Sequence, residues 1–237
     1  MKRVIFTILS ITLFTAAAIK VSAQESSVQN RQVSGFSAIA SSGPFNVHVK
    51  LDGTESVKVD ADSNVINDIE TVVEDNTLKI RFKDRDHRRY EHNVHKAEVY
   101  VSAKSLNALV NSGSGSTNVE GVINADNFKV VLSGSGNIKT SVKSGDLNAT
   151  ISGSGSIKLN GSTGGAKITI SGSGQVEAKG LKTESADVVI TGSGNVYVIA
   201  EKSVSAHITG SGNVEYSGNA SVVNARTIGS GRVNKVD

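Results

Sequence analysis

The densest cluster of ionisable side chains in the 237-residue chain lies between residues 79 and 96. It contains His87, His92 and His95, and imidazole is a common ligand of zinc. The arginines and lysines around them oppose a bound cation, so we favour a solvated loop over a metal site. The same positive charge suits an anion, such as a phosphate or an acidic glycan. The candidate contacts for that anion are Arg81, Lys83, Arg85, Arg88 and Arg89.

Two other patterns resemble ligand-binding loops but lack a required residue. Gly-Ser-Gly triplets suggest a dinucleotide loop, yet the third glycine of GxGxxG is missing, as where Glu177 follows Gly172 and Gly174. The stretch 60–64 (Asp-Ala-Asp-Ser-Asn) begins like a calcium loop, but Val65 stands where that loop needs glycine. We therefore predict structural turns at both places and no bound metal or cofactor.

Nucleophilic catalysis also finds no support in the sequence. With 0 Cys there is no thiol nucleophile, no disulfide and no lipid-anchored cysteine. His48 and His207 cannot be linked to any one serine with an orienting acid. We predict that the protein is not an enzyme.

The N-terminus has the pattern of a targeting segment. Lys2 and Arg3 precede an uncharged run over 4–19, and Val21-Ser22-Ala23 offers small residues for cleavage. This predicts a secretory signal peptide over 1–23, followed by an extension over 24–34. The alternative is a membrane anchor, but the run is shorter than the roughly 20 residues that span a bilayer. We expect an exported bacterial protein, periplasmic, surface-located or secreted, and not a lipoprotein.

Removal of this segment changes the charge balance. The whole chain has 25 Lys+Arg and 22 Asp+Glu, and Lys2, Arg3 and Lys20 lie before the cleavage site. The mature chain then has 25 − 3 = 22 basic against 22 acidic residues. We therefore expect no nucleic-acid partner, which would call for a strong basic excess.

The elements that must position any site are set by a repeat. Gly-Ser-Gly triplets recur at spacings of 21, 19, 19, 20, 18 and 19 residues. Their first and third residues, which we predict to be structural corners, are Gly113, Gly115, Gly134, Gly136, Gly153, Gly155, Gly172, Gly174, Gly192, Gly194, Gly210, Gly212, Gly229 and Gly231. Glycine there allows positive φ or close backbone approach.

Apolar and polar residues alternate on both sides of each triplet, which is the period of a half-buried strand. We expect each unit to hold two strands, a corner and a polar turn such as 182–185. A constant period near 19 residues favours coils that stack, so we predict an all-β parallel β-helix over 109–237. Asn111 and Thr227 replace the usual Leu or Ile, which we take as the sign of end caps.

The preceding region, 35–108, contains strands of varying length without a period. We expect strands at 36–40, 45–51, 56–61, 70–74, 77–82 and 97–101, a turn at 41–43, and one helical turn at 65–69. The region forms either irregular coils of the same solenoid or a β cap on its end.

The sequence resembles the auto-transporter adhesin head family called the GIN domain. The resemblance is carried by 35–39 (Gly-Phe-Ser-Ala-Ile), 46–49 (Asn-Val-His-Val), 77–80 (Thr-Leu-Lys-Ile) and the Gly-Ser-Gly series. It covers nearly the whole mature chain and implies one exported β-helical domain over 35–237. The family brings no catalytic residues to transfer.

We accordingly expect an adhesin-like binding module for carbohydrate or an envelope protein. Two alternatives stay open: a polysaccharide-active β-helix enzyme, and a structural envelope protein that self-associates as a homo-oligomer.

Overall fold

The computed structural model describes residues 26–83 and 94–236. Predicted features that fall on 1–25 and 84–93, including the signal peptide, lie outside the described residues. The elements in chain order are β1 (Ser26–Arg31), β2 (Ala38–Ser42), β3 (Asn46–Leu51), β4 (Ser56–Asp62), the 3₁₀ turn η1 (Ile66–Asp68), β5 (Ile69–Glu74), β6 (Thr77–Phe82), β7 (Ala97–Ala103), β8 (Ala108–Gly113), β9 (Ser116–Gly134), β10 (Asn137–Gly153), β11 (Ser156–Gly172), β12 (Gln175–Gly192), β13 (Asn195–Gly210), β14 (Asn213–Ser217), β15 (Ser221–Gly229) and β16 (Arg232–Lys235). No helix within these ranges is long and apolar enough to cross a membrane.

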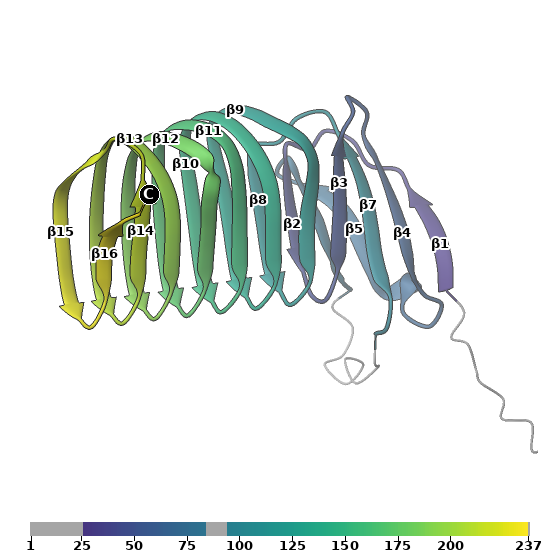
Figure 1. The fold of residues 1–237 in the computed structure, drawn as a ribbon. Coiled ribbons are helices and arrows are strands. Elements are labelled where there is room, and N and C mark those ends of the chain that lie inside the picture. The colour runs from purple at the N-terminus through teal and green to yellow at the C-terminus, as the bar shows by residue number, and fades with distance from the viewer. Residues whose placement is uncertain (1–25, 84–93, 237) are drawn as a thin grey trace, which may run out of the picture.

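The strands stack along one axis as a β-solenoid, which confirms the predicted fold class (Figure 1). The solenoid has two walls. The first wall contains, in order, β1, β4, β7, β3, the N-terminal parts of β9 to β13, β14 and β16. The second wall contains β5, β6, β2, β8, the C-terminal parts of β9 to β13, and β15. From β3 and β2 onward all neighbours are parallel.

The opposite edges of the solenoid turn in different ways. At one edge the coils of β9 to β13 each bend within a single long strand, and Ser162 and Thr163, for example, pair in register with Lys182 and Thr183. In the last coil residues 218–220 separate β14 from β15. The polar turn predicted at 182–185 is wrong, since these residues belong to the ladder of β12. The hydroxyl of Thr183 is buried at the bend and donates to the carbonyl oxygen of Ser185 at 2.9 Å.

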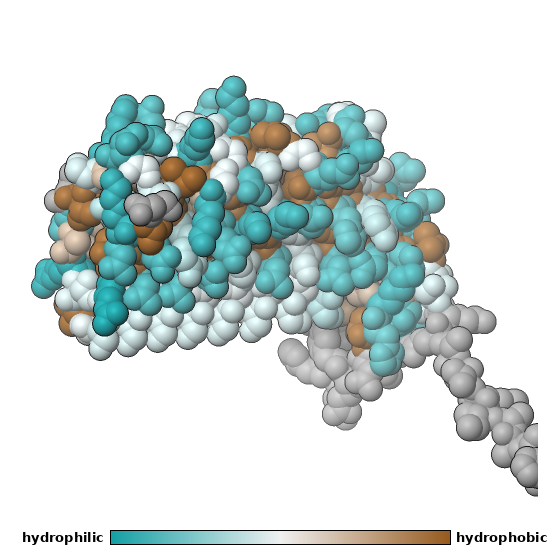
Figure 2. Space-filling model, in the orientation of Figure 1, coloured by the Kyte–Doolittle hydropathy of each residue, from teal (hydrophilic) through white to brown (hydrophobic). Residues whose placement is uncertain are grey.

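At the other edge the Gly-Ser-Gly triplets make sharp corners. Both glycines of a triplet approach the preceding coil closely, and a Cβ on Gly153 would lie 2.4 Å from the carbonyl oxygen of Gly134. Gly153 also has φ +127°, which L side chains rarely adopt, and a Cβ on Gly155 would lie 2.4 Å from the carbonyl oxygen of Gly136. The amide of Ser154 donates to the carbonyl of Gly134 at 3.0 Å, so the ladder continues through the corner. Figure 2 shows this edge as a straight, pale row beneath the polar side chains of the visible face.

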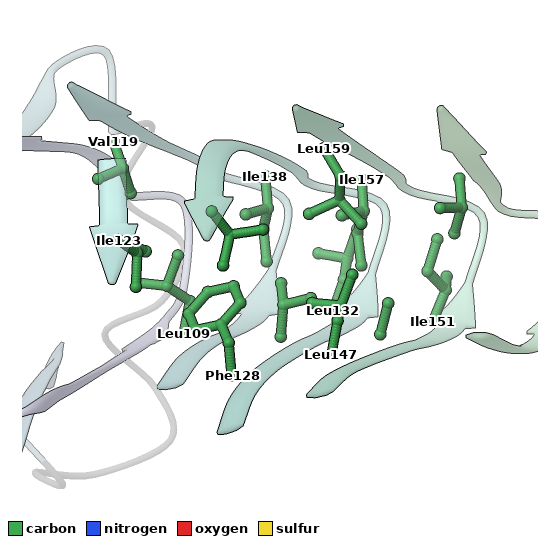
Figure 3. Close-up of a cluster of buried hydrophobic side chains, with 14 of the residues drawn as sticks. Leu109, Val119, Ile123, Phe128, Leu132, Ile138, Leu147, Ile151, Ile157 and Leu159 are labelled. Atoms are coloured by element: carbon green, nitrogen blue, oxygen red, sulfur yellow. The ribbon is translucent and has the colours of Figure 1, made fainter. Parts of the chain in front are cut away.

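The core is a column of aliphatic side chains between the walls (Figure 3). Leu132, Ile151 and Ile170 follow one another in register on the second wall, and each is at most 1% exposed. β-branched and leucine side chains fill this narrow space, and burial of each stabilises the fold by about 1.5–3 kcal/mol.

The N-terminal region was predicted to form either irregular coils of the solenoid or a β cap on its end, and it contains both. Strands β2 and β3 form a coil whose corner is 43–45 (Gly-Pro-Phe), since Ser42 lies opposite Ser112 and Gly115 stacks on Phe45. The predicted turn at 41–43 was thus placed too early. Strands β6 and β7 stack on β2 and β3 as the next strands of the second and first walls.

The cap consists of antiparallel strands. β4 pairs antiparallel with β7 and with β1, and β5 pairs antiparallel with β6. Asp75 and Asn76 have φ +49° and +57°, as in the two-residue hairpin turns that suit twisted strands.

Asn111 is not in an end cap, because β8 lies between β2 and β9. Its side chain is buried and donates to the carbonyl oxygen of Gly115 at 2.8 Å. Thr227 does lie in β15, the last strand of the second wall.

Candidate functional site

An open groove of about 550 Å³ crosses the outer surface of the first wall near its capped end. Its residues come from β1, β4, β7, β3 and β9, which are neighbours in that order. Four strand spacings of roughly 4.8 Å give the groove a length of about 19 Å along the solenoid axis. It therefore fits an extended ligand that lies across the strands.

Strand alternation places the lining in rows. On each strand the valines point into the core, as Val47, Val59 and Val99 do, and the residues between them face solvent. The registers join one outward residue per strand into the Tyr100 row, which contains Asn30, Lys58, Tyr100, His48 and Asn118. A second row, the Lys50 row, contains Ser56, Ser102, Lys50 and Glu120.

Tyr100 lies at the centre of the Tyr100 row and has a partner on each side. The ring of His48 stacks on it with centroids 5.0 Å apart and an interplanar angle of 18°. The Lys58 ammonium nitrogen lies 4.4 Å from the Tyr100 ring centroid, within cation–π range. The tyrosine remains 39% exposed, so its edge and hydroxyl are available to a ligand.

Glu98 fixes the orientation of His48. Its Oε2 lies 2.6 Å from His48 Nε2, and its Oε1 accepts a hydrogen bond of 2.9 Å from the Asn46 amide. Asn46 in turn accepts from the backbone amide of Ser116 at 3.3 Å. This chain of bonds orients His48 from the adjacent row on the same outer surface.

The Lys50 row is flanked by a hydrogen-bonded turn. The carboxylate of Asp52 accepts from the hydroxyl and the amide of Thr54, and these bonds lower the pKa of Asp52. The Ser102 hydroxyl donates to the same carboxylate at 3.2 Å. Lys50 forms no ion pair with any residue in the described part of the chain, although its positive charge also lowers the pKa of Asp52.

The predicted anion contacts lie elsewhere. Arg81 is on β6 of the second wall, where Nε donates to Glu70 at 2.8 Å and Nη2 to Glu74 at 3.4 Å. Lys83 donates to the carbonyl oxygen of Asn67 at 2.6 Å. Arg85, Arg88 and Arg89 lie outside the described residues, as do His87 and His92. Anion binding by this segment stays a prediction.

The acidic stretch 60–64 has a structural use. The buried carboxylate of Asp62 accepts the backbone amides of His95 at 2.8 Å and Lys96 at 3.2 Å. Asp60 pairs with the Lys96 ammonium at 2.8 Å, which raises the pKa of that lysine. Among residues 26–83 and 94–236, no three His, Cys, Asp or Glu side chains are grouped to hold a metal ion.

The groove residues were missed by the sequence analysis, which considered His48 only as a catalytic histidine. Alternation along the predicted strands 45–51, 56–61 and 97–101 is the signal that would have placed His48, Lys58 and Tyr100 on the outer surface. Nothing in the sequence indicated that β4, β7 and β3 are neighbours in that order, because chain order and spatial order differ here.

Comparisons with known proteins agree with the fold. A solved structure described as a putative adhesin from Bacteroides fragilis superposes with a TM-score of 0.82 at 22% identity, covering 90% of this chain and 98% of the other. One described as a putative lipid binding protein from Parabacteroides distasonis gives 0.74 at 24% identity, covering 91% and 98%. A putative adhesin from Parabacteroides merdae gives 0.72 at 22%, also covering 91% and 98%. No curated protein matches the chain.

The match to a family is direct and spans most of the solenoid and part of the cap. It begins just before β2, includes the groove strands β4, β7, β3 and β9, and ends after β14. The chain belongs to the family described as "Putative auto-transporter adhesin, head GIN domain", which matches residues 35–220.

Proposed function

We propose that this protein is an exported, non-enzymatic, adhesin-like module that binds carbohydrate through the groove on the first wall. The observation that carries the proposal is the Tyr100 row, in which an aromatic ring, an imidazole, a lysine and two amides line an extended open groove. Membership of an adhesin head family supports the surface-binding role.

The chemistry of the lining favours a sugar. Amide and hydroxyl groups such as those of Asn30, Asn118 and Ser102 both donate and accept, which suits the hydroxyls of a glycan. A peptide that binds by strand addition needs an open sheet edge, whereas β4, β7 and β3 have partners on both sides. One structural neighbour is described as lipid binding, but an acyl chain in this groove would desolvate the charged groups of Lys50, Lys58 and Glu120.

The carboxylates around the groove favour binding over hydrolysis. Glycosidases use two carboxylates that flank the scissile bond. Glu120 is the single carboxylate in the described lining of the groove. Glu98 and Asp60, in the adjacent row, contact His48 and Lys96, and Asp52 beside the Lys50 row accepts hydrogen bonds from Thr54 and Ser102.

A glycan array tests the proposal with the mature chain, residues 24–237, and a panel of neutral, uronate-bearing and sulfated glycans. We expect Tyr100→Ala to weaken binding about tenfold or more, as truncation of a central aromatic contact does. Lys129→Ala, on the outer surface of the second wall, is the matched control and should bind normally. Failure of the wild-type chain to bind any glycan, or normal binding by Tyr100→Ala, would refute the proposal.

Export is tested separately. We expect the protein purified from envelope or culture medium to begin at Gln24, as cleavage after Ala23 requires. N-terminal sequencing and intact mass measure this. Retention of residues 1–23 on the envelope-bound protein would show a membrane anchor instead.

A further inference from the structure

The Tyr100 row does not end with the groove. Asn118 is in register with Lys139, which continues to Lys158, Glu177 and Tyr197 on successive coils. All these residues occupy the same outward position, three residues after the corner glycine or its equivalent. One straight line of side chains therefore runs along the first wall from the cap into the repeat coils.

Tyr197 repeats the lysine contact found at Tyr100, although its register neighbour on the other side is Glu215, where Tyr100 has His48. The Lys179 ammonium nitrogen lies 4.3 Å from the Tyr197 ring centroid, compared with 4.4 Å for Lys58 and Tyr100. In both cases the lysine comes from the neighbouring strand on the capped side, β12 for Tyr197 and β4 for Tyr100. Six strand spacings separate the two tyrosines, which places the rings on the order of 29 Å apart.

Positive charge predominates between the two rings. Glu177 is neutralised locally, because it lies 3.5 Å from the Lys158 ammonium and accepts a hydrogen bond from the Gln175 amide at 3.0 Å. Lys50 and Lys139 have no ion-pair partner among the described residues. Lys58 and Lys179 lie at the rings, and Lys139 and Lys158 lie between them on the line. Among the described residues, two acids without an ion pair adjoin this line: Glu120 beside Lys50, and Glu215 beyond Tyr197.

We infer that the first wall is a continuous binding track with two tyrosine–lysine stations, at Tyr100 and Tyr197, for an acidic polysaccharide that lies along the solenoid axis. This rests on the proposed carbohydrate-binding function of the groove. The lysines between the stations bind the carboxylates or sulfates of successive sugars. A chain long enough to reach both stations gains affinity over a short one, because its second contact is intramolecular.

The test is a length series of two acidic polymers, polygalacturonate and hyaluronan, measured by calorimetry with the mature chain. Fractions too short to reach 29 Å are compared with fractions well beyond it. We expect the long fractions to bind at least about tenfold more tightly per chain, since linked sites commonly gain 10²–10⁴. Fully methyl-esterified polygalacturonate, which keeps the backbone and loses the charge, should bind at least tenfold more weakly than the acid form.

Variants separate the stations. Tyr197→Ala should abolish the advantage of long fractions and leave the binding of short fractions to the groove within twofold of wild type. Lys139→Ala should lower the affinity for long fractions and should raise the affinity for no fraction. Lys167→Ala, on the second wall, should leave the affinity for every fraction unchanged. Tyr197→Phe keeps the ring and should retain the length advantage.

Other results would overturn the inference. Equal affinity of short and long fractions, unchanged length dependence in Tyr197→Ala, or a preference for the esterified polymer would each do so, and the groove could still bind neutral glycans on the array. Loss of all glycan binding, on the array and in the length series, would overturn the proposed function as well.

Discussion

The two regions of this solenoid reach the same cross-section by different means. From β9 to β13 every coil repeats one solution, with a Gly-Ser-Gly corner, a smooth bend and aliphatic residues in register. From β1 to β8 the corners differ from the triplets, and strands β6 and β7 lie on the capped side of the coil of β2 and β3, although they come later in the chain. Antiparallel strands close this end.

The comparison shows where a solenoid can hold a unique site. In the repeat coils each outward position is surrounded by its own equivalents, so a row changes gradually along the axis. In the N-terminal region β4, β7, β3 and β9 bring unrelated segments together, and the Tyr100–His48–Lys58 cluster arises at that junction. Binding sites are commonly found on such irregular parts supported by a regular scaffold.

We expect the largest loss of stability from a substitution in the corner 43–45, which has no Gly-Ser-Gly triplet. Phe45 stands where the other corners have glycine, is 0% exposed and packs on Phe82 with ring centroids 4.9 Å apart. We expect Phe45→Ala to lower the free energy of unfolding by about 3–5 kcal/mol through the cavity it leaves. Urea denaturation followed by circular dichroism measures this. Phe45→Leu should lose markedly less, and equal losses for both variants would mean that the ring does not fill the core.

We expect a substitution at a repeat corner to lower the free energy of unfolding by less than Phe45→Ala does. Even the smallest side chain should be unfavourable there. A Cβ at residue 155 would lie 2.4 Å from the Gly136 oxygen and 2.6 Å from Leu132 Cδ2. We expect Gly155→Ala to destabilise the protein by about 2–3 kcal/mol, as overpacking does. Ser154→Ala, at the exposed middle of the same corner, should change stability by less than about 0.5 kcal/mol. Similar losses for the two variants would remove close approach as the reason for the glycine.

The smallest expected effect is a change of stability with pH, which should be greater in the N-terminal region than in the repeat coils. The pKa values of Glu55 and Glu74 are lowered, chiefly by hydrogen bonds from Lys104 and Lys79, and that of Asp52 is lowered by Thr54. A lowered pKa contributes stability above the ordinary value, 4.5 for Glu, that is lost as the pH falls through the folded-state pKa. These groups are exposed, so the contribution is small.

We therefore expect acid to loosen the N-terminal region before the repeat coils. Hydrogen exchange at pH 6 and pH 3, corrected for intrinsic rates, should show lower protection first in β4 to β6. Glu74→Gln should reduce this pH dependence in β5 and β6. Uniform loss of protection along the solenoid would contradict the expectation.

Much of the fold was predictable because the repeat makes the sequence redundant. Seven triplets at nearly constant spacing and alternating Ile or Val positions define the strands, the corners and the stacking. The bend at 182–185 was predicted as a turn because its residues are polar. Only the tertiary structure shows that this segment pairs with the preceding coil, β11, and that the Thr183 hydroxyl donates to the carbonyl oxygen of Ser185.

The site was much less predictable. Arg81 belongs to the densest cluster of charge in the sequence, but the fold pairs it with Glu70 and Glu74 on the second wall. Tyr100 and His48 are unremarkable in sequence and are 52 positions apart, yet their rings stack.

The sequence by itself determined the period of the coils, the inward and outward faces of the strands and the places where only glycine fits. These are local properties, set by backbone conformation and by the spacing of apolar residues. The tertiary structure decided which strands are neighbours, since pairing of distant segments depends on closure of the cap and not on any local pattern. The groove consists of residues from five neighbouring strands, so it exists only because the tertiary structure places those strands in this order.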